Sequence, residues 1–473
     1  MHRRLRAGRR RDARRGCRHP SLTDRPRDSP TAHGRAHPSL AARPCADAPS
    51  LESVPYLPGR QGHPMTGHGS HRSSLSGRFS HDPDLDFEIR TVLGGAFSGA
   101  ADAGEALAAV ADVGTDHRAW FRAWDALGDR LAATGESCAA RGHRVSAASA
   151  YLRAATYLGV AVNAVSGLED DAPLLPTFRK HRAAWDRWVD LVDLDVERLP
   201  IPYEGTTLPG YLFRAPGVDP GVRGPVVVAV NGSDGSLPSL WSAVVSGAVR
   251  RGYHALVFDG PGQQSVLFEH GVPFRPDFEA VLTPVLDAVV ARADVDPGRV
   301  AVYGISQGGY WVTRALAFEH RPAAAVVDPG VVDVATSWER EVPKSLLKLL
   351  DKGDDHAFDR DMALGLHLSR GAARTWRFRA RPYGEQGYAA TLREVRRYDA
   401  SDVAAQVTTP LLVTSPEDEQ FWPGQPERLA GLVPGATLVT FSDDEGASGH
   451  CEPLGRALVE QRVLDWLDER LAR

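Results

Sequence analysis

Hydrophobic residues recur at helical spacing between about residue 82 and residue 195. One apolar stripe, with steps of four, three and four residues, consists of Trp120, Trp124, Leu127 and Leu131. Such steps place side chains on a single face of a helix, and the same spacing returns over residues 148–158 and 185–192. Asp82 followed by Pro83 is typical of a helix start, because Asp caps free N–H groups and proline fits the first turn. We therefore predict a helical region over residues 82–195, whose apolar faces pack against the rest of the chain.

Beyond residue 195 the pattern changes to short runs that are apolar at nearly every position. A hairpin of two strands, 196–203 and 208–213, is expected first, around Glu204-Gly205-Thr206. The runs that follow are 226–230, 254–258, 300–303, 323–327, 411–413 and 437–441. Helix-length segments separate most of them, and uniformly apolar strands that alternate with helices indicate a parallel sheet covered on both faces. Residues 196–473 are thus expected to form an α/β catalytic domain.

One connection in this pattern, residues 334–403, is too long for a simple crossover between strands. It contains the helical stretches 344–350 and 358–368. We interpret it as a helical cap inserted over the functional site.

The first 81 residues show no periodicity and are rich in Arg, Pro and Ser, with eight arginines within residues 1–16. Such a composition is typical of a disordered extension. No apolar stretch follows the positive residues, so a secretory signal peptide is not expected. A start of translation at Met65 would remove most of this extension, and we favour that interpretation.

Composition narrows the function classes. The formal net charge of −5, with 42% hydrophobic and 24% charged residues, is that of a globular protein and disfavours nucleic acid as a partner. The four cysteines, Cys17, Cys45, Cys138 and Cys451, lack disulfide density and metal-ligand spacing, which fits a cytoplasmic protein. No membrane span, metal site or cofactor motif is expected.

The segment Gly304-Ile305-Ser306-Gln307-Gly308 carries the strongest chemical signal. It follows the apolar run 299–303 and precedes a helical stretch, 309–316. A serine on a tight strand-to-helix turn between glycines resembles the nucleophile elbow of α/β-hydrolases. Ser306 is therefore the candidate nucleophile.

A serine hydroxyl needs a histidine base and a carboxylate that orients the base. In this fold they arrive in the order Ser, acid, His. His450, on a Gly-rich loop after the last strand, is the candidate base. Asp418 is the candidate acid, because it lies four residues past strand 411–414. The competitors are its neighbours Glu417 and Glu419, and Asp328, which ends an earlier strand.

Acyl chemistry also requires N–H donors for the oxyanion. One is expected from the backbone of Gln307, directly after the nucleophile. The other is expected from Ser233, on the loop after strand 226–230, with Gly232 as the alternative. The turn Asp259-Gly260-Pro261-Gly262-Gln263 is interpreted as structural, because no phosphate-binding lysine pattern follows it.

With these residues in place, the chain resembles α/β-hydrolases that carry a helical N-terminal domain, over about residues 85–473. This group includes dihydropseudooxynicotine hydrolase, fungal hydrolases that shorten naphthopyrones, and fermentation–respiration switch proteins. The matching segments are 151–154, 201–205, 208–211, 258–263, 304–309 and 450–451. One departure is Gln264, which stands where these families often have glycine.

The resemblance implies hydrolysis of a C–C bond in a β-diketone or polyketide-like substrate. It also implies an auxiliary acid in the cap, for which Glu341 is the candidate and Glu339 the second choice. A carboxylesterase or lactonase with the same triad is the alternative, and a partner-binding regulatory protein is an alternative of another class. Helical N-terminal domains in this group often support dimers, so a homodimer is a further expectation.

Overall fold

The computed structural model describes residues 78–217 and 222–471. Residues 1–77, which are most of the predicted extension 1–81, lie outside the described residues, and so does the alternative start at Met65. All described residues fall within one compact unit, Ser70–Arg473. The division near residue 195 therefore stays a prediction from the sequence.

The predicted helical region forms five α-helices. They are α1 (Pro83–Gly94), α2 (Ala103–Val110), α3 (His117–Ala140), α4 (Arg144–Ala164) and α5 (Leu174–Leu191), with short 3-10 turns η1 (Gly95–Ser98) and η2 (Val165–Gly167). The Asp82 side chain caps α1 by accepting from the N–H groups of Asp84 and Leu85, as its position before Pro83 predicts. The apolar stripe of α3 is buried, from Trp120 at 1% exposure to Leu131 at 7%.

Eight strands form one sheet in the order β1-β2-β4-β3-β5-β6-β7-β8. Their bounds are β1 (Val196–Tyr203), β2 (Thr206–Phe213), β3 (Gly224–Val230), β4 (His254–Phe258), β5 (Val295–Ile305), β6 (Ala324–Asp328), β7 (Leu411–Pro416) and β8 (Thr437–Phe441). β2 pairs antiparallel with β1 and β4, and all other pairs are parallel. Every predicted strand is present, and the predicted class is confirmed.

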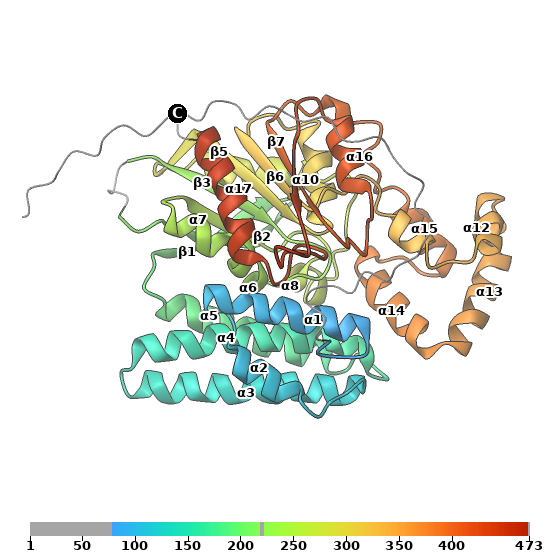
Figure 1. The fold of residues 1–473 in the computed structure, drawn as a ribbon, viewed down its shortest axis with the longest axis horizontal. Coiled ribbons are helices and arrows are strands. Elements are labelled where there is room, and N and C mark those ends of the chain that lie inside the picture. Colours follow the sequence, from blue (N-terminus) through green and yellow to red (C-terminus); the bar gives the residue numbers. More distant parts are fainter. Residues whose placement is uncertain (1–77, 218–221, 472–473) are drawn as a thin grey trace, which may run out of the picture. The chain divides into compact units, whose positions relative to one another are not determined.

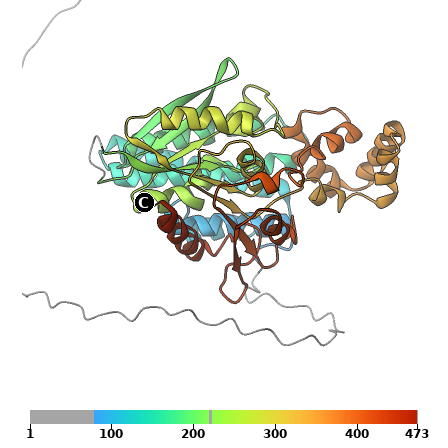
Figure 2. The same ribbon diagram turned by 90° about the horizontal axis from the view of Figure 1, so that it is seen from above.

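Both faces of the sheet are covered, which explains why its central strands are apolar at every position. Along β3, Val227 and Ala229 pack into a core shared with the N-terminal helices, while Val226 and Val228 face a second core. Figures 1 and 2 show α1–α5 along one side of the sheet. The remaining elements of the sheet layers are α6 (Leu237–Leu240), η3 (Trp241–Val245), α7 (Ser246–Arg250), α8 (Gln264–Phe268), α9 (Glu279–Val290), α10 (Gly308–Leu316), η5 (Ala404–Gln406), α16 (Gln425–Leu432) and α17 (Arg456–Leu471).

The long connection between β6 and β7 is helical, as predicted. It contains α11 (Thr336–Glu339), α12 (Lys344–Asp351), α13 (Asp355–Leu368), α14 (Arg370–Ala380), η4 (Arg381–Tyr383) and α15 (Tyr388–Val395), and α12 to α14 lie to one side of the sheet (Figure 1). Arg377 on α14 donates to the carbonyls of Ser166 (2.7 Å) and Leu168 (2.6 Å). Arg381 pairs with Asp171 at 2.8 Å. These contacts tie the cap to the N-terminal helices.

Candidate active site

Ser306 lies on the turn between β5 and α10, in a left-handed backbone conformation with φ of +57°. The two glycines that flank it by two residues leave no room for a side chain. A Cβ at Gly304 would come within 2.4 Å of the Gly308 carbonyl oxygen, and one at Gly308 within 2.8 Å of the Val230 carbonyl oxygen. The predicted strand-turn-helix setting is therefore present, with a strained backbone at the serine.

Three side chains from separate loops form a continuous hydrogen-bonded chain. His450 Nε2 lies 2.8 Å from Ser306 Oγ, and His450 Nδ1 lies 2.8 Å from Glu419 Oε2. The side chains of His450 and Glu419 are only 5% and 4% exposed. Ser306 and His450 are thus together, as the sequence predicts, and the nitrogen facing Ser306 is free to take its proton once Nδ1–H is held by the carboxylate.

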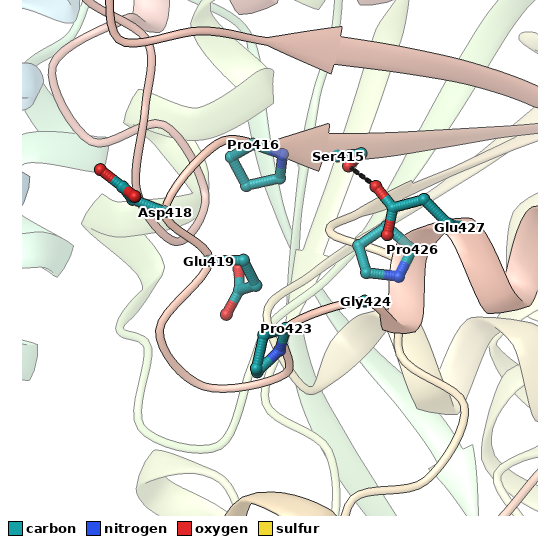
Figure 3. Close-up of a pocket in the computed structure, with 8 residues that line it drawn as sticks. All are labelled: Ser415, Pro416, Asp418, Glu419, Pro423, Gly424, Pro426 and Glu427. Carbon is teal, nitrogen blue, oxygen red and sulfur yellow. Dashed lines mark hydrogen bonds between the residues drawn. The ribbon is translucent and has the colours of Figure 1, made fainter. Parts of the chain in front are cut away.

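The carboxylate that contacts His450 is Glu419 and not Asp418, which corrects the contact expected from the sequence. β7 continues to Pro416, so the turn begins later than the apolar run suggests. Asp418 lies on that turn with φ of +59°, and its side chain is exposed and directed away from Glu419 (Figure 3). A cavity of about 350 Å³ beside this loop is lined by residues of β7, the loop and α16, including Asp418, Glu419 and Glu427.

Glu419 is held as a carboxylate by its surroundings. Its Oε1 accepts the N–H groups of Phe421 (2.8 Å) and Trp422 (3.0 Å). Burial alone would raise the pKa of Glu419, but His450 and these two N–H groups outweigh burial and lower it. The other two competitors do not touch His450: Glu417 accepts from the N–H of Asp443 (2.9 Å), and Asp328 bonds elsewhere.

One predicted oxyanion donor, Gln307, directly follows the serine, and the other, Ser233, is on the loop whose Gly232 lies against the serine. A Cβ at Gly232 would be 2.7 Å from Ser306 Cβ, so the loop after β3 runs directly along the nucleophile. The Gly232 N–H is already used by Asn231 Oδ1 at 3.1 Å. Within the described part of the chain, the N–H groups of Gln307 and Ser233 have no acceptor, which leaves both available to an oxyanion.

The side chain of Gln263 fixes the loop after β3, which carries Gly232 and Ser233. Its Nε2 donates to the carbonyls of Asn231 (2.9 Å) and Gly232 (3.1 Å), and its Oε1 accepts the Gly260 N–H (2.9 Å). The side chain is only 3% exposed. The turn 259–263 is thus structural, as predicted, but it acts on the site through this amide. The next residue, Gln264, has φ of +34°, a conformation that favours glycine.

Aromatic rings surround His450. Phe421, Trp422 and Phe87 have ring centroids 4.7, 5.6 and 6.1 Å from the imidazole. Phe87 comes from α1, so the helical region contributes to the site. From the cap, the Tyr383 hydroxyl donates to Gln307 Oε1 at 3.4 Å. The surroundings of the triad favour apolar or aromatic groups.

A carboxyl group with a raised pKa, Glu88, follows Phe87 on α1. Glu88 is half-buried and accepts a hydrogen bond from Trp120 Nε1 at 2.6 Å. Burial, together with the nearby carboxylates of Asp234 and Asp84, raises its pKa to about 8, because these effects outweigh the Trp120 bond.

The two glutamates expected as auxiliary acids in the cap pair with arginines and not with Ser306, His450 or Glu419. Glu341 is 67% exposed and lies 3.5 Å from Arg340. Glu339 accepts from Arg396 Nε at 2.6 Å.

Among the described residues, no group of three or more His, Cys, Asp or Glu side chains could hold a metal ion. No helix of the described chain is long and apolar enough to cross a membrane.

Comparison with known proteins identifies the family and the fold of this chain. Residues 227–459 match the alpha/beta hydrolase family. The alpha/beta hydrolase xenA of Xenoacremonium sinensis is 30% identical over 431 residues, which cover 83% of this chain and 97% of the relative. The chain belongs to the alpha/beta hydrolase family. The alpha/beta hydrolase pydG of an Acremonium species is 34% identical over 296 residues, covering 59% of this chain and 68% of pydG.

Among solved structures, this hydrolase is similar in fold to 2,6-dihydroxy-pseudo-oxynicotine hydrolase. The TM-score is 0.63 at 20% identity, over 80% of this chain and 95% of the other. The fold likeness therefore extends beyond the residues that the family match covers, 227–459, into the helical region.

The sequence did not identify Gln263 and Phe87 as residues that contact the site. For Gln263 a signal exists. It follows Gly-Pro-Gly directly after β4, and β4 is the neighbour in the sheet of β3, whose following loop carries Gly232 and Ser233. For Phe87 no signal was available, because one aromatic residue in an amphipathic helix resembles an ordinary core position.

Replacement of Gln263 by leucine should lower kcat about 10- to 100-fold with little change in KM. The substitution leaves the Asn231 and Gly232 carbonyls without their donor and loosens the loop that carries the Ser233 N–H; a single lost oxyanion donor costs about 100- to 1000-fold in a protease. Steady-state kinetics on an aryl ester measure the effect. The matched control is Gln264→Gly, which should keep kcat within about twofold; equal losses in both variants would refute a specific role for Gln263.

Proposed function

We propose that this chain is a serine hydrolase in which Ser306 is the nucleophile, His450 the general base and acid, and Glu419 the group that orients His450. The observation that carries the proposal is the continuous chain from Ser306 Oγ through His450 to Glu419, with both contacts at 2.8 Å. His450 Nε2 takes the proton of Ser306 as its oxygen attacks a carbonyl carbon. The N–H groups of Gln307 and Ser233 then stabilise the tetrahedral oxyanion.

The second half of the cycle uses the same groups. When the tetrahedral species collapses, the leaving group departs and takes the proton from protonated His450. A water molecule, deprotonated by His450, then attacks the acyl-serine and releases the acid product and free Ser306. Glu419 keeps Nδ1–H hydrogen-bonded throughout, which stabilises the imidazolium form in each step.

We propose C–C bond hydrolysis of an aryl or polyketide-like β-diketone as the leading reaction. Here Ser306 attacks one ketone, the bond to the central carbon breaks, and the leaving carbanion is stabilised as an enolate by the second carbonyl before His450 protonates it. The aromatic rings of Phe87, Phe421 and Trp422 around His450 suit an aryl ketone. Glu341 is left out of this proposal because it is exposed and paired with Arg340.

Ester or lactone hydrolysis is the second candidate. The observation that favours it is that both cap glutamates pair with arginines and neither contacts the triad, which leaves the triad and the two N–H donors as the groups available for the reaction. An ester needs no more, since its alkoxide leaving group accepts a proton directly from His450. A purely regulatory protein would have no need of the Ser306–His450–Glu419 chain.

Product analysis by mass spectrometry distinguishes these reactions. The chain and its Ser306→Ala variant would each receive an aryl β-diketone and a matched aryl ester. Cleavage of the diketone to an aryl acid and a methyl ketone, lost in the variant, would support C–C hydrolysis. Ester cleavage alone would make the chain an esterase, and cleavage of neither substrate by the chain would contradict both proposals.

A further inference from the structure

A fully buried polar network lies directly beneath the triad and is not used in the mechanism above. Its centre is Asp328, the last residue of β6, together with Glu452 in the loop that carries His450 and Arg456, the first residue of α17. Asp328 and Glu452 are both 0% exposed, and Arg456 is 6% exposed. Charged residues are rarely buried to this extent without a role for the charge or the proton.

The main chain of this network connects the catalytic loops. The Asp328 carbonyl accepts the N–H of Ser306 at 2.6 Å and the thiol of Cys451 at 3.3 Å. Arg456 Nη1 in turn donates to the Cys451 carbonyl at 2.8 Å. The nucleophile turn and the residue next to His450 are therefore fixed to the same carbonyl group at the end of β6.

The side chains contain two carboxyl groups and one guanidinium. Asp328 accepts the Tyr303 hydroxyl and the Thr414 hydroxyl, the latter at 3.0 Å. Arg456 Nη1 lies 3.6 Å from Asp328 Oδ2 and 3.8 Å from Glu452 Oε2. One cation balances one carboxylate, and a second buried negative charge at this place would be costly.

Glu452 is the carboxyl group of this network whose surroundings favour the neutral form. Its two carboxyl oxygens have no hydrogen-bond partner among the described residues. Asp328 Oδ2 and Glu452 Oε2 lie 3.6 and 3.8 Å from the same Arg456 Nη1, and only a protonated Glu452 could donate to the Asp328 carboxylate. Burial first, and then the Asp328 charge, raise the pKa of Glu452 well above its usual value, against the opposing effect of Arg456.

The remaining groups that face Glu452 agree with a neutral acid. Glu419 adds a further negative charge nearby, which also favours the protonated form. Cys451 stays a neutral thiol, since burial and the same carboxyl groups raise its pKa well above the usual value. The backbone at Cys451 and Glu452 is left-handed, with φ of +57° and +42°. This conformation is strained for residues other than glycine, and it positions the Glu452 carboxyl group in the buried network.

We propose that Glu452 is a positioning residue which, as a neutral carboxylic acid, shares its proton with Asp328 and thereby holds the Ser306 turn and the His450 loop in catalytic register. Loss of that proton would place two like charges against each other and loosen the Asp328 carbonyl that both loops use. The inference rests on Ser306 being the nucleophile, but it does not depend on whether the substrate is a diketone or an ester.

The test compares Glu452→Gln with Glu452→Ala. Glutamine is neutral, has nearly the same shape and offers an N–H to Asp328, so it should rescue kcat on an aryl ester to within about threefold. Alanine should lower kcat about 10- to 100-fold with KM nearly unchanged. On the alkaline side, the wild type should lose kcat as Glu452 ionises, whereas Glu452→Gln should keep it to higher pH.

The matched control is Glu445→Ala, in the same loop but at the surface, where it pairs with Arg462; its kcat should equal that of the wild type. If Glu452→Ala fails to fold, Glu452→Gln alone decides. Two results would overturn the inference. One is a folded Glu452→Gln variant whose kcat falls about 10- to 100-fold, as expected for Glu452→Ala. The other is a Glu452→Gln variant that loses kcat at the same alkaline pH as the wild type. A wild type that fluorophosphonate does not label at Ser306 would instead contradict the proposed function.

Discussion

Replacing Ser306 with alanine should lower kcat by about 10⁴-fold or more for every substrate that the chain hydrolyses. Loss of the serine in a well-studied triad protease costs about 10⁶-fold, because no other group can form the acyl intermediate. The thermal midpoint should change by no more than a few degrees, since the variant removes one oxygen and its bond to His450 Nε2. Steady-state kinetics and thermal unfolding on the same preparations measure both.

The control for this variant is Ser137→Ala on the exposed side of α3, which should leave kcat unchanged. A folded Ser306→Ala protein with more than about one hundredth of the wild-type rate would contradict the assignment of the nucleophile.

Glu419→Gln should lower kcat about 10³- to 10⁴-fold, whereas Asp418→Asn should change it less than about threefold. The amide of glutamine cannot stabilise the imidazolium and holds the wrong tautomer of His450, an effect of about 10⁴-fold in a protease triad. Asp418 is exposed and makes no contact with His450. The two adjacent substitutions form a matched pair, since each replaces one carboxylate by its amide.

The pH dependence gives a second reading of the same pair. Because the pKa of Glu419 is lowered in the fold, its carboxylate contributes stability that is present above its unfolded pKa and lost as the pH falls through its folded pKa. Glu419→Gln should therefore lose most of this acid-side dependence of the unfolding free energy. Near wild-type activity in Glu419→Gln together with a large loss in Asp418→Asn would return the acid role to Asp418.

The architecture and the contact between Ser306 and His450 could be predicted from the sequence. The strands are apolar at successive positions because helices cover both faces of the sheet, and this signal is purely local. Ser306 was found because its turn needs Gly304 and Gly308, and His450 because the order of the loops along the chain is fixed by the fold. Each of these inferences depends on chain order or on close backbone approach.

The sequence could not decide which acidic residue contacts His450. Glu417, Asp418 and Glu419 are consecutive, and the backbone conformation of one turn determines which of them faces the imidazole. A left-handed conformation at Asp418 directs its side chain outward and brings the next residue, Glu419, to His450. The roles of Gln263 and Glu452 were equally out of reach. Each acts on residues far away in sequence, and such contacts appear only once the loops are assembled.

Fluorophosphonate labelling followed by peptide mass mapping tests the central claim most directly. Folded wild-type chain should gain one label, on the peptide that contains Ser306, and His450→Ala should react at least about 100-fold more slowly because the hydroxyl loses its base. No label on folded protein, or a label on another residue with Ser306 unmodified, would contradict the account of this site as a Ser306–His450–Glu419 hydrolase.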